Sequence, residues 1–112
     1  MAKYPNGPGQ VEVSFRFARH VGPRFVHGAV TLQFDSLGPF SFTSKAVWPT
    51  SDNYDLAVRD EVQTVIEELQ GHLGSTSVTL KAIEWEDVAS CESGFRQAAR
   101  AATEAAFKVG VR

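Results

Sequence analysis

The sequence predicts an α+β fold, a two-layer α/β sandwich in which a four-stranded mixed sheet carries two helices on one face. Three observations lead to this prediction. Apolar and polar residues alternate through much of residues 10–47, which is typical of half-buried strands. An amphipathic helical pattern follows in residues 54–70. A β-branched segment then leads into an alanine-rich helix, so the predicted element order is βββαβα.

Three strands are predicted before the first helix. The first begins at Gln10, and the second follows a turn centred on Gly22-Pro23. The third ends before Pro49, because proline lacks the amide donor that a sheet ladder needs. We expect these three strands to form an antiparallel meander. Their apolar faces consist of Val11, Val13, Phe15 and Phe17, then Val30, Leu32 and Phe34, then Phe40 and Phe42.

Two helices and a fourth strand are predicted after residue 50. The first helix has N-cap candidates at residues 50–53 and ends at Gly71 or Gly74. Residues 76–85 are rich in β-branched side chains and predict the fourth strand. Ser90 is predicted to cap the second helix. The predicted buried stripes are Val58, Val62, Val65, Ile66 and Leu69 in the first helix, and Phe95, Ala98, Ala99, Ala102, Ala105, Ala106 and Val109 in the second.

Length and composition predict one domain. The 112 residues suffice for one core and are too few for two, so residues 10–112 are expected to form a single domain. Residues 1–9 are rich in Pro and Gly and are expected to be a mobile lead-in. No apolar run resembles a signal peptide or approaches the roughly 20 residues that span a bilayer. The lone Cys91 suits a reducing compartment, so we expect a cytoplasmic protein without membrane contact.

The net charge of −2 argues against a broad electrostatic surface for nucleic acid. The charges are nevertheless distributed unevenly. Residues 50–92 are strongly acidic, whereas residues 1–30 and 93–112 are basic. Two explanations of this pattern stay open, which are solvated faces on amphipathic elements and a bipolar surface with a binding role.

Several segments resemble domain IV of translation elongation factor G. The resemblance is strongest from Val78-Thr79-Leu80 onward, where the family has a Val-Thr-Leu strand. It continues without a gap through residues 88–92, where the family's Val-Asp-Ser-Ser-Glu reads Val-Ala-Ser-Cys-Glu, to Phe95-Arg96, where the family has Phe-Lys. The opening strand at Gln10-Val11, the turn at residues 22–28 and Asn53-Tyr54 also match in order. The resemblance therefore covers nearly the whole chain.

This resemblance implies a particular fold and a particular working surface. The fold is that of the second domain of a small-subunit ribosomal protein, in which a βαβ crossover is left-handed although most such crossovers are right-handed. The working surface is a pair of loops at the tip of the domain, which in elongation factor G reach the decoding region of the ribosome. This chain departs from the family there. Glu86 occupies the position of the family's histidine, and a carboxylate repels phosphate.

Two loops hold the candidate binding residues. A basic cluster with an aromatic side chain in the first can hold an RNA backbone and stack a base, or it is a plain solvent-facing hairpin tip. A tryptophan beside two acids in the second is typical of a protein-binding hot spot, or it packs over the rim of the sheet. The bases and acids could also pair and neutralise the tip. The candidates are Arg19, His20, Arg24, Phe25 and His27 in the first loop and Trp85, Glu86 and Asp87 in the second.

The sequence favours a binding protein over an enzyme. The three histidines lack the spacing of metal ligands, and no carboxylate pair suited to acid–base catalysis is evident. No Gly-x-x-x-x-Gly-Lys-Ser/Thr motif is present, so we expect no bound nucleotide, no GTPase activity, no metal and no cofactor. The first hypothesis is a non-enzymatic domain similar to elongation factor G domain IV that binds the ribosome or structured RNA. The alternative is a protein-interaction or self-assembling domain that keeps the fold and has lost the ribosomal role.

Overall fold

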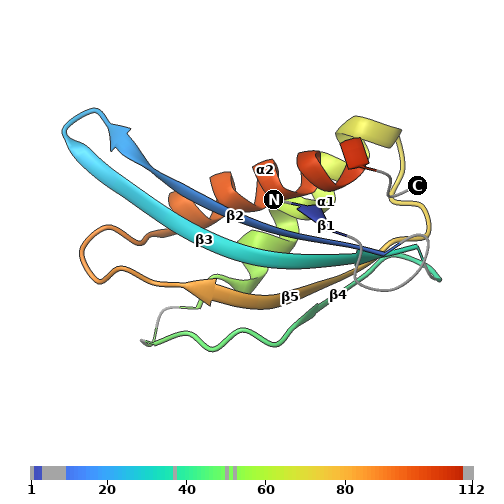
Figure 1. Cartoon of the computed structure of the whole chain (residues 1–112), viewed down its shortest axis with the longest axis horizontal. Coiled ribbons are helices and arrows are strands. Elements are labelled where there is room, and N and C mark those ends of the chain that lie inside the picture. The colour runs from blue at the N-terminus through green and yellow to red at the C-terminus, as the bar shows by residue number, and fades with distance from the viewer. Residues whose placement is uncertain (1, 4–9, 37, 50, 52, 110–112) are drawn as a thin grey trace.

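The protein folds into two layers, a mixed β-sheet and a pair of helices that cover one face of it (Figure 1). The structure is a computed structural model that describes residues 2–3, 10–36, 38–49, 51 and 53–109. The two-layer α+β class predicted from the sequence is therefore confirmed. Its strands are β1 (Ala2–Lys3), β2 (Gln10–Val21), β3 (Arg24–Asp35), β4 (Ser41–Ser44) and β5 (Ser77–Glu84).

The sheet has one strand more than the sequence predicted. Its order is β1-β2-β3-β5-β4, and every neighbouring pair is antiparallel except β4 and β5. The extra strand β1 comes from the expected lead-in, where Ala2 pairs with Val13 and Lys3 with Glu12. Residues 4–9 of that lead-in lie outside the described residues.

The expected three-stranded meander is wrong. The third strand, β4, does not pair with β3, because β5 enters the sheet between them. The reason lies in the side chains: β5 buries Val78 and Leu80, which suits a central strand, whereas β4 is short and mostly polar, which suits an edge. With the helices behind the sheet, the chain passes from β4 through the first helix to β5 in the left-handed sense (Figure 1).

The helices are α1 (Asp55–Gln70) and α2 (Glu92–Val109). Tyr54 is the N-cap of α1 and makes no side-chain capping bond, whereas the side chain of Asn53 accepts a hydrogen bond from the Asp55 amide at 2.9 Å. Gly71 ends α1 with a left-handed φ of 81°, one of the two ends that the sequence allowed. Leu69 was expected in the buried stripe but is 51% exposed, because the stripe ends with the last turn.

The core lies between the sheet and the helices. Small residues on α2 let its backbone approach β3 closely. A Cβ placed on Gly28 would lie 2.2 Å from the carbonyl carbon of Gly94, so the helix and strand can meet here only without side chains. The central cluster comprises Val11, Val13, Val30, Leu32, Phe34, Val58, Val62, Ile66, Val78, Leu80, Phe95, Ala98, Ala99, Ala102 and Ala106.

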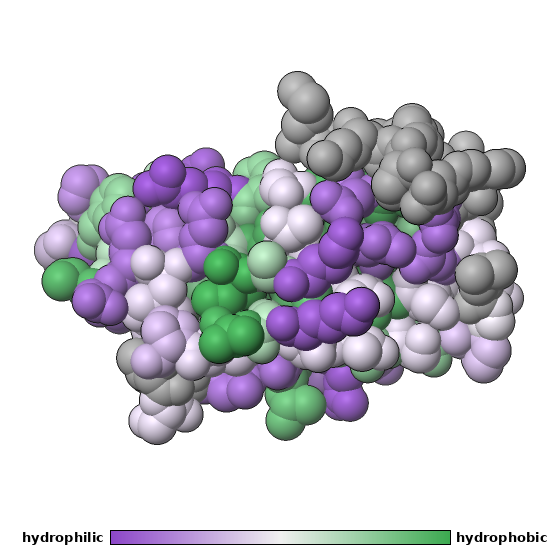
Figure 2. All heavy atoms as spheres, turned by 60° about the horizontal axis from the view of Figure 1, so that its bottom comes forward, coloured by the Kyte–Doolittle hydropathy of each residue, from purple (hydrophilic) through white to green (hydrophobic). Residues whose placement is uncertain are grey.

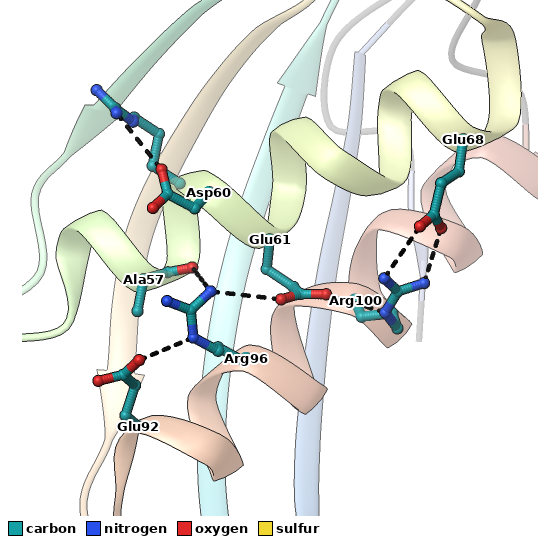
Figure 3. A network of polar contacts seen from close by, with 8 residues as sticks. Ala57, Asp60, Glu61, Glu68, Glu92, Arg96 and Arg100 are labelled. Atoms are coloured by element: carbon teal, nitrogen blue, oxygen red, sulfur yellow. Dashed lines mark hydrogen bonds and ion pairs between the residues drawn. The ribbon is translucent and has the colours of Figure 1, made fainter.

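An ion-pair network ties α1 to α2 on the outer side of the helical layer (Figure 3). Glu61 accepts hydrogen bonds from Arg96 at 3.5 Å and from Arg100 at 3.0 Å. Arg100 also holds Glu68 through two bonds of 2.9 and 3.5 Å, and Arg96 holds Glu92 at 2.9 Å. Hydrogen bonds from the glutamates raise the pKa of both arginines above an already high value, so both guanidinium groups stay charged at neutral and acid pH.

Glu68 gives this network a pH dependence. The hydrogen bonds from Arg100 hold the pKa of the Glu68 carboxyl below its usual range. Because this pKa is lower in the folded than in the unfolded protein, the pair stabilises the fold above the unfolded pKa and loses that contribution as the pH falls through the folded pKa. We therefore expect wild type to exceed Glu68→Gln in stability near neutral pH, and the difference to shrink and then vanish in acid as the pH falls through the lowered pKa of Glu68.

Urea unfolding of both proteins at each pH and at low salt measures this difference. Glu67→Gln is the matched control, since Glu67 is exposed on the same turn and has no ion pair within the described part of the chain. A Glu68→Gln deficit of the same size at both pH values would contradict the expectation.

Candidate functional site

The two candidate loops lie at the same end of the molecule, as the sequence analysis expected (Figure 1). The loop after β5, residues 85–91, runs beside β3 and forms an isolated parallel bridge between Ser90 and His27. The His27 amide donates to the Ala89 carbonyl at 3.0 Å, and the Cys91 amide donates to the His27 carbonyl at 3.3 Å. The β2–β3 hairpin continues past this loop and ends at its own tip.

The hairpin tip presents basic and aromatic side chains to solvent. Two ring contacts lie there, a cation–π contact on one face and an aromatic pair on the other. The Arg19 guanidinium lies 5.0 Å from the centre of the Phe17 ring, and His20 packs edge-on against Phe25, its partner across the strands, at 5.2 Å. Arg24 is exposed beside the turn. Within the described residues neither Arg19 nor Arg24 has a carboxylate partner, so their charges are available to a ligand.

His27 is not part of this exposed surface, so its expected loop position is wrong. The turn consists only of Gly22-Pro23, and β3 begins directly afterwards. The His27 side chain is 1% exposed, and its Nδ1 forms a 2.9 Å hydrogen bond with the Ser90 hydroxyl. That hydroxyl also accepts a bond of 2.8 Å from the Glu86 amide. His27 and Ser90 therefore hold the 85–91 loop against β3, and Ser90 does this in place of the capping role that the sequence predicted.

Trp85 belongs to an aromatic cluster between the layers. It stacks on Phe95 at 5.7 Å and 19° and on Tyr54 at 6.1 Å and 21°, and Trp48 meets it edge-on at 6.2 Å. Its indole nitrogen is enclosed and has no hydrogen-bond partner among the described residues. This position favours the structural explanation of the tryptophan, packing at the rim of the core, over a contact platform.

Glu86 and Asp87 are exposed, and the possible pairing of these acids with the basic residues of the tip is not found among the described residues. Glu86 pairs instead with Arg16, a residue that the sequence analysis did not select, at 3.2 Å. Arg16 lies nearer the base of the hairpin, so this ion pair neutralises the base and leaves the tip charged. The sequence placed Arg16 on the polar face of an alternating strand, which indicated that its side chain is exposed. No feature near Arg16 in the sequence indicated that its partner is Glu86, 70 residues away.

Gly28 and Gly94 are the other residues that sequence reasoning missed. Both are buried, and together they set how closely α2 approaches β3 beside the bridge of His27 and Ser90. A lone glycine inside a strand pattern is a known sign of close backbone approach, and this sign was available at Gly28.

The end of the molecule that holds the tip also exposes apolar side chains, among them Val21, Phe25 and Val88. Seen from below and in front of the view in Figure 1, apolar residues gather in small separate patches among polar side chains (Figure 2). Within the described residues, no group of three or more His, Cys, Asp or Glu side chains is placed to hold a metal ion. None of the described helices is both long and apolar enough to cross a membrane.

Comparisons with known proteins bear on the fold. Neither a family model nor a curated protein matches the sequence. Among solved structures, the fold is similar to part of a crystal structure of a protein from Thermus thermophilus, with a TM-score of 0.77 and 13% sequence identity. The match covers 90% of this chain and 16% of the Thermus chain, so this chain spans a small part of that protein's length. Such a likeness shows a shared fold.

Proposed function

We propose that this protein is a non-enzymatic RNA-binding domain, similar to domain IV of elongation factor G, that contacts the ribosome or structured RNA with the tip of its β2–β3 hairpin. The observation that carries the proposal is the pair of arginines without carboxylate partners among the described residues, Arg19 and Arg24, on a hairpin tip whose other face carries the exposed ring of Phe25. Arginine is the side chain best suited to phosphate, and an exposed aromatic ring can stack a base.

The charge distribution supports contact through the tip rather than through the body. The arginines of the helical layer are held in ion pairs: Arg96 and Arg100 bind glutamates across the two helices, and Arg59 lies 3.4 Å from Asp60. Arg16 is held by Glu86. Among the described arginines, the two without a carboxylate partner therefore lie at the end of the hairpin, which offers a polyanion uncompensated guanidinium groups although the whole protein is slightly acidic.

Cosedimentation with ribosomes and with a structured RNA, at low and at moderate salt, tests the proposal. We expect binding at low salt that weakens as salt rises. The double variant Arg19→Gln/Arg24→Gln should bind more weakly and should reduce the slope of log K against log salt by roughly 0.7 to 0.9 per lost phosphate contact. Arg59→Gln removes an arginine from α1 and should behave as wild type. Absence of binding at low salt, or unchanged binding by the double variant, would refute the proposal.

A protein-interaction or self-assembling domain is the second candidate function. The observation in its favour is the outer edge of β2, which pairs with β1 only at Glu12 and Val13 and has no other strand beside it within the described residues. An unpaired edge can accept a strand from another chain. Size-exclusion chromatography with light scattering separates the two candidates, since a stable dimer that covers the hairpin tip is incompatible with RNA contact there.

A further inference from the structure

The outer edge of β2 is long, regular and open. β1 covers it only at Glu12 and Val13, and residues 15–21 have no strand beside them within the described part of the chain (Figure 1). Their register with β3 continues to the turn without a shift, so no bulge interrupts this edge, and the segment contains no proline. Bulges, prolines and very short edge strands are the means by which proteins prevent pairing with another chain. The opposite edge of the sheet, β4, is protected in this way, since it has only 4 residues.

The turn at the end of the hairpin shows which backbone groups of this edge can bond to a new strand. Gly22-Pro23 is a two-residue turn that closes on the pair of Val21 and Arg24. Such a turn ends in a pair that exchanges hydrogen bonds, and bonded pairs alternate with unbonded ones along an antiparallel ladder. Every second residue of β2 therefore directs its N–H and C=O groups away from β3. Between residues 15 and 21 these are Arg16, Ala18 and His20.

Apolar side chains border the open edge on the side of the helices. Val11 and Val13 are buried in the core, so the alternation of the strand places Phe15, Phe17 and Val21 on the same face. Phe15 is 38% exposed and Val21 is 54% exposed. A strand laid along β2 would cover both side chains, so the burial of apolar surface would add to the main-chain hydrogen bonds.

The charge of the hairpin indicates which kind of strand fits this edge. Residues 13–34 contain no Asp or Glu, but they contain Arg16, Arg19 and Arg24. Among the described residues, Glu86 pairs with Arg16, and the other two arginines have no carboxylate partner. Two copies of β2 side by side would bring their cations together, and like charges that face each other across strands are destabilising. An extended segment that carries carboxylates is stabilised by the same cations.

We infer that residues 15–21 of β2 accept an extended, acidic segment of a partner protein, which adds an antiparallel strand to the sheet. This site develops the protein-interaction candidate given above and does not depend on RNA binding. The antiparallel direction continues the row that β1 begins beside β2. The partner segment places apolar side chains beside Phe15 and Val21 and a carboxylate beside Arg19, all on the helix side of the sheet.

Fluorescence anisotropy with a labelled peptide, Thr-Val-Thr-Glu-Thr-Val-Thr-Val-Thr, tests the inference. In the register given above, its valines and glutamate lie on the helix side, and its inner threonines lie opposite Arg16, Ala18 and His20. The amides of these threonines therefore bond to β2, so methylating the amide nitrogen of the central threonine should weaken binding about 10-fold. The same methyl group on the adjacent valine points away from β2 and should leave binding unchanged. Replacing the glutamate by glutamine should weaken binding about threefold.

Ala18→Pro tests the same contact from the side of the protein. Proline removes the outward amide of residue 18 and is tolerated on an edge strand, so this variant should lose the peptide, whereas Ala18→Ser should keep it. Circular dichroism establishes that each variant is folded. Absence of binding to wild type, or equal binding of the two methylated peptides, would overturn the inference. Undiminished binding of the glutamine peptide would refute an acidic partner. A dimer in light scattering that Ala18→Pro abolishes would identify a second copy of this chain as the occupant instead.

Discussion

Replacing Gly94 by alanine is expected to lower the free energy of unfolding by about 3 kcal/mol, the upper end of what overpacking usually costs. The new methyl group would lie 2.1 Å from the carbonyl oxygen of His27 and 2.4 Å from its carbonyl carbon. Neither neighbour is a flexible side chain. The His27 backbone is held on both sides, by β2 and by the bonds with Ala89 and Cys91, so α2 must move away from the sheet to relieve the clash.

Urea unfolding of Gly94→Ala and Gly71→Ala measures this effect against a matched glycine. Gly71 has φ of 81° and open space around its Cα, so its substitution meets only backbone strain, about 1 kcal/mol. The double variant Gly28→Ala/Gly94→Ala should cost less than the sum of its single variants, because one displacement of the helix makes room for both methyl groups. A Gly94→Ala variant no less stable than Gly71→Ala would show that the two backbones are not in contact.

The pattern of apolar and polar side chains predicted most of the helices and strands, because the repeat of apolar residues that marks each element lies within one short segment of sequence. Alternation located β2 and β3, and the stripe beginning at Val58 located α1, since each is set by residues within one segment. The antiparallel pairing of β2 with β3 was predicted correctly, whereas the place of β4 in the sheet and the presence of β1 were not. A strand as short as Ser41–Ser44 carries too little pattern to choose a neighbour, and a two-residue strand such as Ala2–Lys3 has no period.

The candidate site was predicted in part, for the same reason. Arg19, His20, Arg24 and Phe25 lie exposed at the tip, because a hairpin turn is a local feature that Gly22-Pro23 marks. The position of His27 depends on the Ser90 hydroxyl, 63 residues away, and no local signal predicts that bond. Long-range partners decide which polar residues of a loop are structural, and one sequence does not specify them.

The dependence on long-range partners is clearest at Trp85, whose aromatic neighbours Trp48, Tyr54 and Phe95 are all distant from it in the sequence or in another element. Phe95 lies at the centre of this cluster. It is 0% exposed, and its ring contacts Trp48 at 4.9 Å, Trp85 at 5.7 Å and Tyr54 at 5.8 Å. The cluster joins α2 to the start of α1 and to the end of β5, so it supports the 85–91 loop from beneath.

Phe95→Ala is therefore expected to lower the free energy of unfolding by about 3–5 kcal/mol, since it removes a buried ring and leaves a cavity. Tryptophan fluorescence reports the same change locally, because Trp48 and Trp85 both lose their contact with the ring and should emit at longer wavelength. Phe15→Ala, at a position that is 38% exposed, should cost clearly less, about 1–2 kcal/mol, and leave the emission unchanged. Equal losses in the two variants would mean that the cluster does not support this end of the fold. A large loss for Phe95→Ala with unshifted emission would mean that the two indoles do not rest on Phe95, and would return Trp85 to the set of residues that could contact a partner.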